Sequence, residues 1–497
     1  MPSLRHRRAI LALAIVASSS AVACAISVPR PEGTVVGRNG RGDVRSTLTD
    51  FRGGAVKKSA AAAKGDESES GKTGMSAATF NLIKACVGSG VLALPAGVAA
   101  IGDVSAALVP ASIMVVGLGL LSAYSFFMLG RINDASEKKS SSMGDMWKNE
   151  VGEGSSWVVT LSCFLTPLGA ALAYSIMLGD MLSSLAETAG LKGILATRHT
   201  AILAITSLVL YPLCGLKSLA ALAPVSMVAI FGVAATCVFM YMRMASGAYA
   251  EGGAYFDTIA SNLQPSFGNI GTSKVKSPSI LVLGGMAATA YLVHFSALDF
   301  HNDLEDNTLK RFGSLVGMGF SATAVINILF MIFGFLTFGG NCAGLVLNNY
   351  SIKDIGATLV RLVTVISLVG SYPIFMRGIK SAWFELTAGG KDISEEQNKK
   401  TTTAFLAAIT GLALVLENAG FMVGFTGATM GSAIIYIFPP ILYLRSSARR
   451  IASGALEKTN KVKLERLFCQ FLIALGAIVG VLGGIVAVLD SFFPGVL

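Results

Sequence analysis

Residues 81–95 read NLIKACVGSGVLALP and lie inside the first long apolar segment that follows the polar N-terminal region. The Gly88–Gly90 core and Pro95 are poor choices for an uninterrupted membrane helix. Unwound backbone at membrane depth is tolerated only where protein buries it or where it lines a wet cavity. An interrupted helix of this kind points to a substrate site near the bilayer midplane, where free N–H and C=O groups can hold a carboxylate and a cation. The stretch therefore predicts transport across a membrane.

The composition is that of an integral membrane protein. The chain has 497 residues, of which 53% are hydrophobic and only 14% are charged, and its mean hydropathy is +0.65. Soluble domains carry about a quarter charged residues. The apolar runs are long and continuous, as in helices that cross the hydrocarbon with about 20 residues each, and 55 glycines indicate close helix packing.

Eleven membrane-spanning helices are expected, and the basic residues orient them. The spans run over 77–101, 105–130, 156–183, 199–214, 217–245, 279–300, 313–338, 355–379, 402–417, 420–444 and 467–490. With the N-terminal tail inside, the outside loops carry only Lys192, Arg198, Lys274, Lys276 and Lys353, and the inside loops carry many more Lys and Arg residues. This imbalance predicts orientation and accounts for the net charge of +10 without a nucleic-acid partner. The sequon at Asn349 then falls outside.

The N-terminal region has features of targeting signals. A basic start (Arg5–Arg8), a short apolar core (Ala9–Ala23) and an Ala-Cys-Ala cleavage-like site predict a signal peptide over 1–28, with an uncleaved helix as the alternative. Residues 29–75 are polar and basic, as in a transit segment or a disordered cytosolic tail. The combination resembles bipartite plastid signals of algae, so an endomembrane or plastid-envelope location is expected. The membrane domain itself is expected over 76–492.

A second irregular segment occurs five spans after the first. Residues 279–304 are interrupted by Gly284 and Gly285 and become polar halfway. Irregular segments in spans one and six suggest two inverted five-span repeats with the binding site between them. The halves share no visible sequence identity, so this inference depends on hydropathy alone.

Five motifs in order carry a family resemblance. They are Asn81–Pro95, His294 with Asp303-Leu304, Gly334–Gly340 before Leu347–Ser351, Arg361 with Ser371-Tyr-Pro373, and Gly427–Gly431 with Phe438-Pro439. Over roughly residues 76–492 the chain resembles the amino acid/auxin permease family, which includes the sodium-coupled neutral amino acid transporters. The resemblance implies an all-α, LeuT-like fold of the APC superfamily with two inverted five-helix repeats plus an eleventh helix. It also implies secondary active transport of amino acids, coupled to H⁺ or Na⁺, by alternating access.

The predicted substrate site combines the two irregular segments. Amides around Gly88, Ser89 and Gly90 would hold the substrate carboxylate, and the alternative is a helix contact made by small residues. A second set of substrate-binding candidates comes from the span-six break, where carbonyls would meet the ammonium group: Tyr291, His294 and Ser296. His294 could instead brace the break through hydrogen bonds to nearby carbonyls.

Neutral oxygen ligands suggest a cation site between spans one and eight. Asn81 supplies an amide oxygen, and Ser367 and Ser371 lie four residues apart on one face of a helix. In the resembled sodium-coupled transporters, the matching span-one Asn and a span-eight hydroxyl are associated with sodium. The alternative for the serines is capping of carbonyls in their own helix.

Lys84 departs from the commonest sodium-coupled pattern of that family. It lies on the same face as Asn81 and Gly88, and an intramembrane Lys is a functional candidate by default. Because burial disfavours the charged form of a lysine, its ammonium could replace sodium and titrate during transport, which would favour proton coupling. The alternative is a lysine that extends to the cytoplasmic interface.

No enzyme motif is visible in the chain, so no catalytic residues, metal or cofactor beyond the coupling ion are expected. His294, Asp299, His301 and Asp303 lack the H-E-x-x-H spacing of a metallohydrolase, and the seven cysteines show no metal-ligand spacing. The expected partners are an amino acid and the lipid bilayer, with no obligate protein partner. Competing functions are a non-transporting amino acid sensor and a carrier for another organic solute such as auxin.

Overall fold

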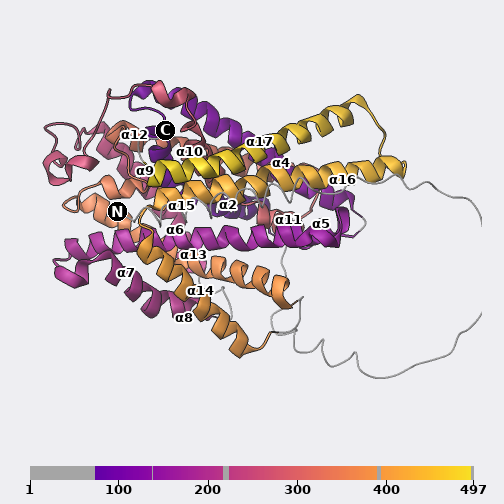
Figure 1. The fold of residues 1–497 in the computed structure, drawn as a ribbon, viewed down its shortest axis with the longest axis horizontal. Helices are drawn as coiled ribbons and strands as arrows, with labels where there is room; N and C mark the ends of the chain where they lie inside the picture. The colour runs from indigo at the N-terminus through magenta and orange to yellow at the C-terminus, as the bar shows by residue number, and fades with distance from the viewer. Residues whose placement is uncertain (1–72, 137, 217–222, 389–392, 494–497) are drawn as a thin grey trace, which may run out of the picture.

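The computed structural model describes residues 73–136, 138–216, 223–388 and 393–493. Its main helices run lengthwise through one elongated body (Figure 1). They are α2 (Met75–Cys86), α3 (Ser89–Ala99), α4 (Leu108–Ala135), α5 (Met143–Glu150), α6 (Ser156–Thr188), α7 (Arg198–Ile205), α8 (Tyr211–Cys214), α9 (Ala223–Ala245), α10 (Ile280–Ala290), α11 (Ala297–Asn302), α12 (Leu309–Phe338), α13 (Ile355–Ala388), α14 (Glu395–Val415), α15 (Ala419–Thr426), α16 (Phe438–Ala452) and α17 (Asn460–Phe492). The expected signal peptide, and all but the last residues of the expected tail, lie outside the described residues.

The predicted all-α, multi-span membrane protein is confirmed. In the described chain, 7 helical segments are long and apolar enough to cross a membrane, and the bent pair α2–α3 makes an eighth. Shorter apolar helices cover Arg198–Cys214 and Phe231–Ala245, and α14 lies at the ninth expected span. Each of the eleven expected segments therefore coincides with a helix or a helix pair, while the inverted-repeat relation stays a prediction.

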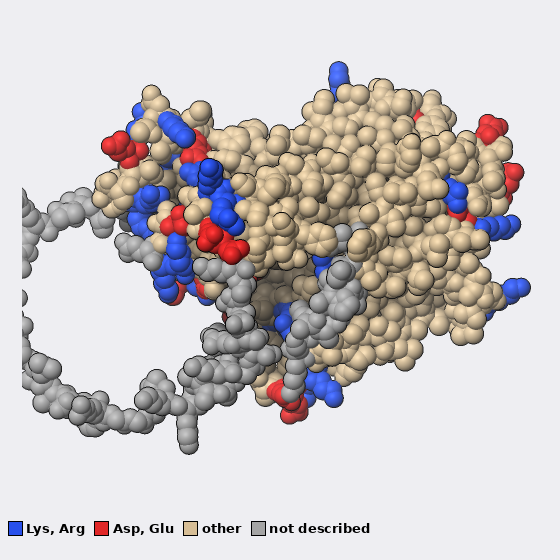
Figure 2. All heavy atoms as spheres, turned by 180° about the vertical axis from the view of Figure 1, so that it is seen from behind, with Lys and Arg blue, Asp and Glu red and all other residues tan. Residues whose placement is uncertain are grey.

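Several helices continue beyond the apolar windows that predicted them. Helix α13 extends to Ala388 and α17 begins at Asn460, where the Thr459 side chain accepts a hydrogen bond from the amide of Val462. Hydropathy marks where a helix leaves the hydrocarbon, whereas capping marks where its backbone hydrogen bonding ends. Most charged side chains accordingly lie toward the two ends of the body, and most of the surface between them is uncharged (Figure 2).

Buried polar anchors hold the loops at the end of the molecule expected to face outside. The carboxylate of Asp103, which follows α3, accepts hydrogen bonds from the amides of Asn269, Ile270 and Gly271 at 2.6–3.0 Å. Burial alone would raise the pKa of Asp103, but these amides together hold the pKa below its usual value. The loop before α10 is thereby fixed to the turn between α3 and α4.

Asn349, the residue of the sequon, is one of these anchors. Its side chain is fully buried. Its amide oxygen accepts a hydrogen bond from the Ala343 amide at 2.8 Å, and its amide nitrogen donates to the carbonyls of Asn341 and Leu263 at 2.8 and 3.3 Å. An acceptor for an N-linked glycan must be accessible at the surface, so the sequon serves the fold and is not a glycan site.

We expect that the wild-type protein from glycosylating cells keeps its gel mobility after glycosidase treatment. Asn349→Ala should lower the free energy of unfolding by about 1–3 kcal/mol, because it leaves buried backbone groups unpaired. Gln264→Thr is the topology control, because it creates an acceptor triplet at the exposed Asn262 in the same region. A glycan on Asn349 of the folded protein would contradict this assignment.

Candidate functional site

The first span is interrupted where the sequence predicts. Helix α2 ends at Cys86, Val87 and Gly88 are non-helical, and α3 begins at Ser89. The two helices meet at an angle of 48°. No side chain caps the N-terminus of α3. Its first amides therefore have no intrahelical acceptor, and they carry the positive end of the helix dipole.

The sixth span is interrupted as well. Helix α10 ends at Ala290, Tyr291–Val293 are non-helical, and a single 3₁₀ turn over His294–Ser296 leads into α11. The C-terminus of α10 presents carbonyl oxygens and the negative end of its dipole. The two breaks therefore offer complementary partial charges.

The two breaks lie against each other. A Cβ atom added to Gly90 would come within 2.8 Å of the Ala290 nitrogen and 2.9 Å of its Cα atom. The first turn of α3 and the last turn of α10 are therefore in backbone contact, which only glycine at position 90 permits. On the other side of α10, Gly427 in the tenth span is packed onto the Gly285 carbonyl, and the Thr289 hydroxyl donates to the Val423 carbonyl at 2.7 Å.

His294 braces the span-six break. Its side chain is buried, and its Nε2 atom lies 2.9 Å from both the Ser122 carbonyl and the Ser125 hydroxyl of α4. Because a carbonyl only accepts, Nε2 carries the hydrogen. Phe126 packs edge-on against the ring at 5.5 Å. The bracing role considered for His294 thus matches its observed contacts.

Polar groups that the sequence reasoning missed also surround the breaks. The hydroxyl of Tyr291 and the amide of Asn327 on α12 are buried near each other, without a hydrogen bond of normal length to any described residue. Tyr174 on α6 reaches Gly88, because an added Cβ there would lie 3.1 Å from its hydroxyl. Buried polar groups without protein partners require a water or a ligand. The sequence offered one signal for Asn327, because a polar residue inside an apolar membrane span is a functional candidate.

The contacts of the described residues do not test the predicted cation site. Asn81 is exposed on α2, and α12 is the helix on which α2 chiefly packs. On α13, the Ser371 hydroxyl donates to the Ser367 carbonyl at 3.0 Å, which is the capping alternative. Lys84 is half-buried in the last turn of α2, close to the break. The cation site therefore stays a prediction.

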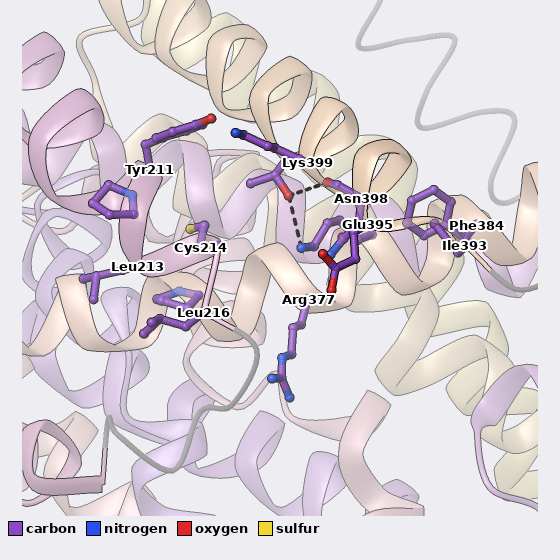
Figure 3. Close-up of a pocket in the computed structure, with 15 residues that line it drawn as sticks. Tyr211, Leu213, Cys214, Leu216, Arg377, Phe384, Ile393, Glu395, Asn398 and Lys399 are labelled. Atoms are coloured by element: carbon purple, nitrogen blue, oxygen red, sulfur yellow. Dashed lines mark hydrogen bonds between the residues drawn. The ribbon is translucent and has the colours of Figure 1, made fainter. Parts of the chain in front are cut away.

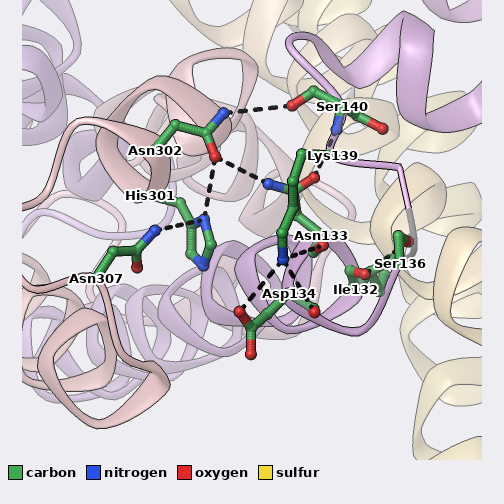
Figure 4. A network of polar contacts seen from close by, with 9 residues as sticks. All are labelled: Ile132, Asn133, Asp134, Ser136, Lys139, Ser140, His301, Asn302 and Asn307. Atoms are coloured by element: carbon green, nitrogen blue, oxygen red, sulfur yellow. Dashed lines mark hydrogen bonds and ion pairs between the residues drawn. The ribbon is translucent and has the colours of Figure 1, made fainter.

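The outer end of each broken span, at the start of α2 and at the end of α11, is bonded to its surroundings. Thr73, just before α2, donates its amide to the Asp303 carbonyl at 2.7 Å and accepts from the Glu305 amide at 3.1 Å. At the end of α11, Asn302 accepts from the Asn133 side chain at 3.0 Å, within the polar network of Figure 4. The half-helices α2 and α11 are thus joined to each other directly, and α11 is also joined to α4.

Comparison with known protein families identifies the family of this chain. The model of the family described as "Transmembrane amino acid transporter protein" matches residues 71–486. The chain belongs to this family. The match covers all the elements that form the two breaks and extends to the eleventh expected span, and members of this family are transporters and not enzymes.

Curated relatives are similar over most of their length. "Putative sodium-coupled neutral amino acid transporter 11" of Danio rerio is 22% identical, covering 86% of this chain and 89% of the relative. "Amino acid transporter AVT6E" of Arabidopsis thaliana is 24% identical, covering 83% of each. "Vacuolar amino acid transporter 5" of Schizosaccharomyces pombe is 21% identical, covering 65% of this chain and 73% of the relative.

Two solved structures resemble the chain at low identity. The crystal structure of MhsT in complex with L-phenylalanine has 13% identity and a TM-score of 0.47, covering 82% of this chain and 98% of that one. The inward-facing conformation of Mhp1 has 11% identity and a TM-score of 0.48, covering 84% of this chain and 90% of that one.

The contact between the breaks predicts a strong effect of Gly90→Ala. The added methyl group meets backbone atoms, which cannot rotate away, so the free energy of unfolding should fall by about 1–3 kcal/mol. Gly317→Ala is the matched control, because nothing lies within 4 Å of its added Cβ and alanine favours the helix by about 1 kcal/mol. Thermal unfolding in detergent measures both. Equal stability of the two variants would contradict the contact.

Proposed function

We propose that the protein is a secondary active transporter of amino acids whose substrate site lies between the broken helices of spans one and six. The observation that carries the proposal is the backbone contact of Gly90 with Ala290, since it sets the N-terminus of one half-helix beside the C-terminus of another. A zwitterion has one charge for each of these ends. No covalent chemistry is needed for this function.

The N-terminus of α3 suits the substrate carboxylate. The amides of Ser89 and Gly90 belong to the first turn of an uncapped helix of 11 residues, and such amides bind anions without a basic side chain. Glycine at positions 88 and 90 adds no side chain beside these amides, and an added Cβ atom there would crowd Tyr174 and Ala290.

The span-six break suits the ammonium group. Carbonyls near Tyr291 and the C-terminus of α10 attract a cation. The unpaired groups of Tyr291 and Asn327 add hydrogen-bonding capacity that water or a substrate would satisfy. His294 acts here as a positioning residue that fixes the break to α4, and Ser296 ends the 3₁₀ turn that leads into α11.

Coupling to an H⁺ or Na⁺ gradient, in symport with the substrate, is part of the proposal. Two charge carriers are available in principle: a bound Na⁺ ligated by Asn81, Ser367 and Ser371, or a proton carried by Lys84. The half-buried position of Lys84 beside the break supports the second route. The first would require α2 and α13 to approach each other in another conformation.

The location within the cell is proposed from the N-terminal region. The protein is an integral, multi-pass membrane protein. The signal-like residues 1–28 and the basic residues 29–75 favour the endomembrane system or the plastid envelope of an alga.

Counterflow of labelled amino acids in proteoliposomes tests the function, with the Na⁺ gradient and the pH gradient varied independently. We expect exchange of at least one amino acid, stimulated by one of the two gradients. Protein-free liposomes and the Gly90→Ala variant are the controls, and the variant should show no exchange. Failure to exchange any amino acid under either gradient would contradict transport.

Lys84→Ala distinguishes the two coupling routes. If Lys84 carries the proton, the variant should keep exchange but lose its response to the pH gradient. Lys310→Ala is the matched control, because Lys310 is exposed at the start of α12 and lies away from the break. A Lys84→Ala variant that retains the full pH response would remove this residue from the coupling mechanism.

A further inference from the structure

A cavity separate from the helix breaks opens between the fourth, eighth and ninth spans. Its volume is about 680 Å³, which is within the range of about 300–1,000 Å³ for small-molecule sites. It is lined by α8, by the C-terminal half of α13 and by the start of α14 (Figure 3). None of the residues that form the two breaks lines it.

One wall of this cavity is basic. Arg377, Lys380 and Lys399 line it, against a single carboxylate from Glu395. The Lys380 ammonium donates to the Thr402 hydroxyl at 3.1 Å, which fixes it between α13 and α14. Figure 3 shows Lys399 on the side of the cavity where Tyr211 lies, with Arg377 and Glu395 on another side. The formal charge of these four groups sums to +2.

The rest of the lining is apolar. Leu213 lies in α8 and Leu216 follows it, Pro373 lies one helical turn before Arg377, and Phe384 and Ile393 complete the wall. A cavity with a cationic side and a hydrocarbon side suits an amphiphile better than a free metabolite. Arg and Lys side chains at a membrane interface commonly lay their stems along apolar surface with the charge outward.

The cavity also lies at the level of lipid headgroups. The fourth and eighth expected spans end at residues 214 and 379 and the ninth begins at 402, so all three cross the membrane surface beside the cavity. Its side of the protein is the one that the distribution of Lys and Arg predicts to be cytoplasmic. Basic pockets between membrane helices on that side bind anionic headgroups.

We propose that this cavity binds the phosphodiester headgroup of an anionic phospholipid from the cytoplasmic leaflet. The phosphate lies beside Lys380 and Lys399, and the acyl chains run along Leu213, Leu216 and Pro373. The bound lipid connects α8, α13 and α14.

Titration of the delipidated full-length protein in detergent with dioleoyl-phosphatidylglycerol tests the proposal, with bound lipid counted by native mass spectrometry. Wild-type protein should retain phosphatidylglycerol in preference to dioleoyl-phosphatidylcholine. Each basic group near a membrane surface changes the affinity for an anionic lipid about fivefold. The double variant Lys380→Gln/Lys399→Gln removes two such groups and should weaken phosphatidylglycerol binding about 30-fold. Glu395→Gln should strengthen binding about fivefold, a gain that partial misfolding cannot imitate.

Matched variants separate this site from general attraction to basic surface. Lys458→Gln/Lys461→Gln removes two exposed lysines, one just before α17 and one in its first turn, which do not line the cavity, and should leave the affinity unchanged. Lys399→Arg keeps the charge and should keep the lipid. If the double variant at the cavity fails to fold, Lys399→Gln alone and Glu395→Gln decide the question.

Three results would overturn the proposal. Equal retention of phosphatidylcholine and phosphatidylglycerol would show that the phosphate environment is not selective for anionic lipid. An equal loss of affinity in the Lys458→Gln/Lys461→Gln control would place the lipid elsewhere. Displacement of phosphatidylglycerol by inorganic phosphate at equal concentration would assign the cavity to a free anion.

Discussion

The structure depends on a single steric constraint, the backbone contact between the first turn of α3 and the last turn of α10. Membrane helices have no hydrophobic force to bring them together, so close packing of small residues takes its place. Glycine at position 90 allows two helix termini to meet without a side chain between them. The termini that meet have opposite dipole ends, and the residues around them, His294, Tyr291 and Asn327, are buried and polar. The contact therefore brings buried polar groups together with two helix termini.

The same constraint explains how the tenth span supports the site. Gly427 packs onto the Gly285 carbonyl, and the Thr289 hydroxyl donates to the Val423 carbonyl, so α10 is held between two neighbours over its whole length. The half-helix α10 is therefore a fixed element. The half-helices α2 and α11 have fewer such contacts with their neighbours.

Much of this arrangement was predictable, because local chemistry determines it. Gly88–Gly90 and the polar second half of 279–304 mark the breaks directly, and hydropathy located a helix or helix pair at every expected span. What could not be predicted depends on rotation about helix axes. The period of a helix in an all-apolar segment carries little signal, so the sequence did not show that Asn81 is exposed or that the Ser371 hydroxyl donates to a carbonyl of its own helix. It also did not show that Ser125 and Tyr174, on other helices, reach the breaks.

The pairing of Thr73 with Asp303 and Glu305 has a mechanical consequence. Two backbone hydrogen bonds join the residue before α2 to the residues that follow α11, so the half-helices α2 and α11 are attached to each other at this point. A displacement of the chain immediately before α2 is transmitted to both halves at once.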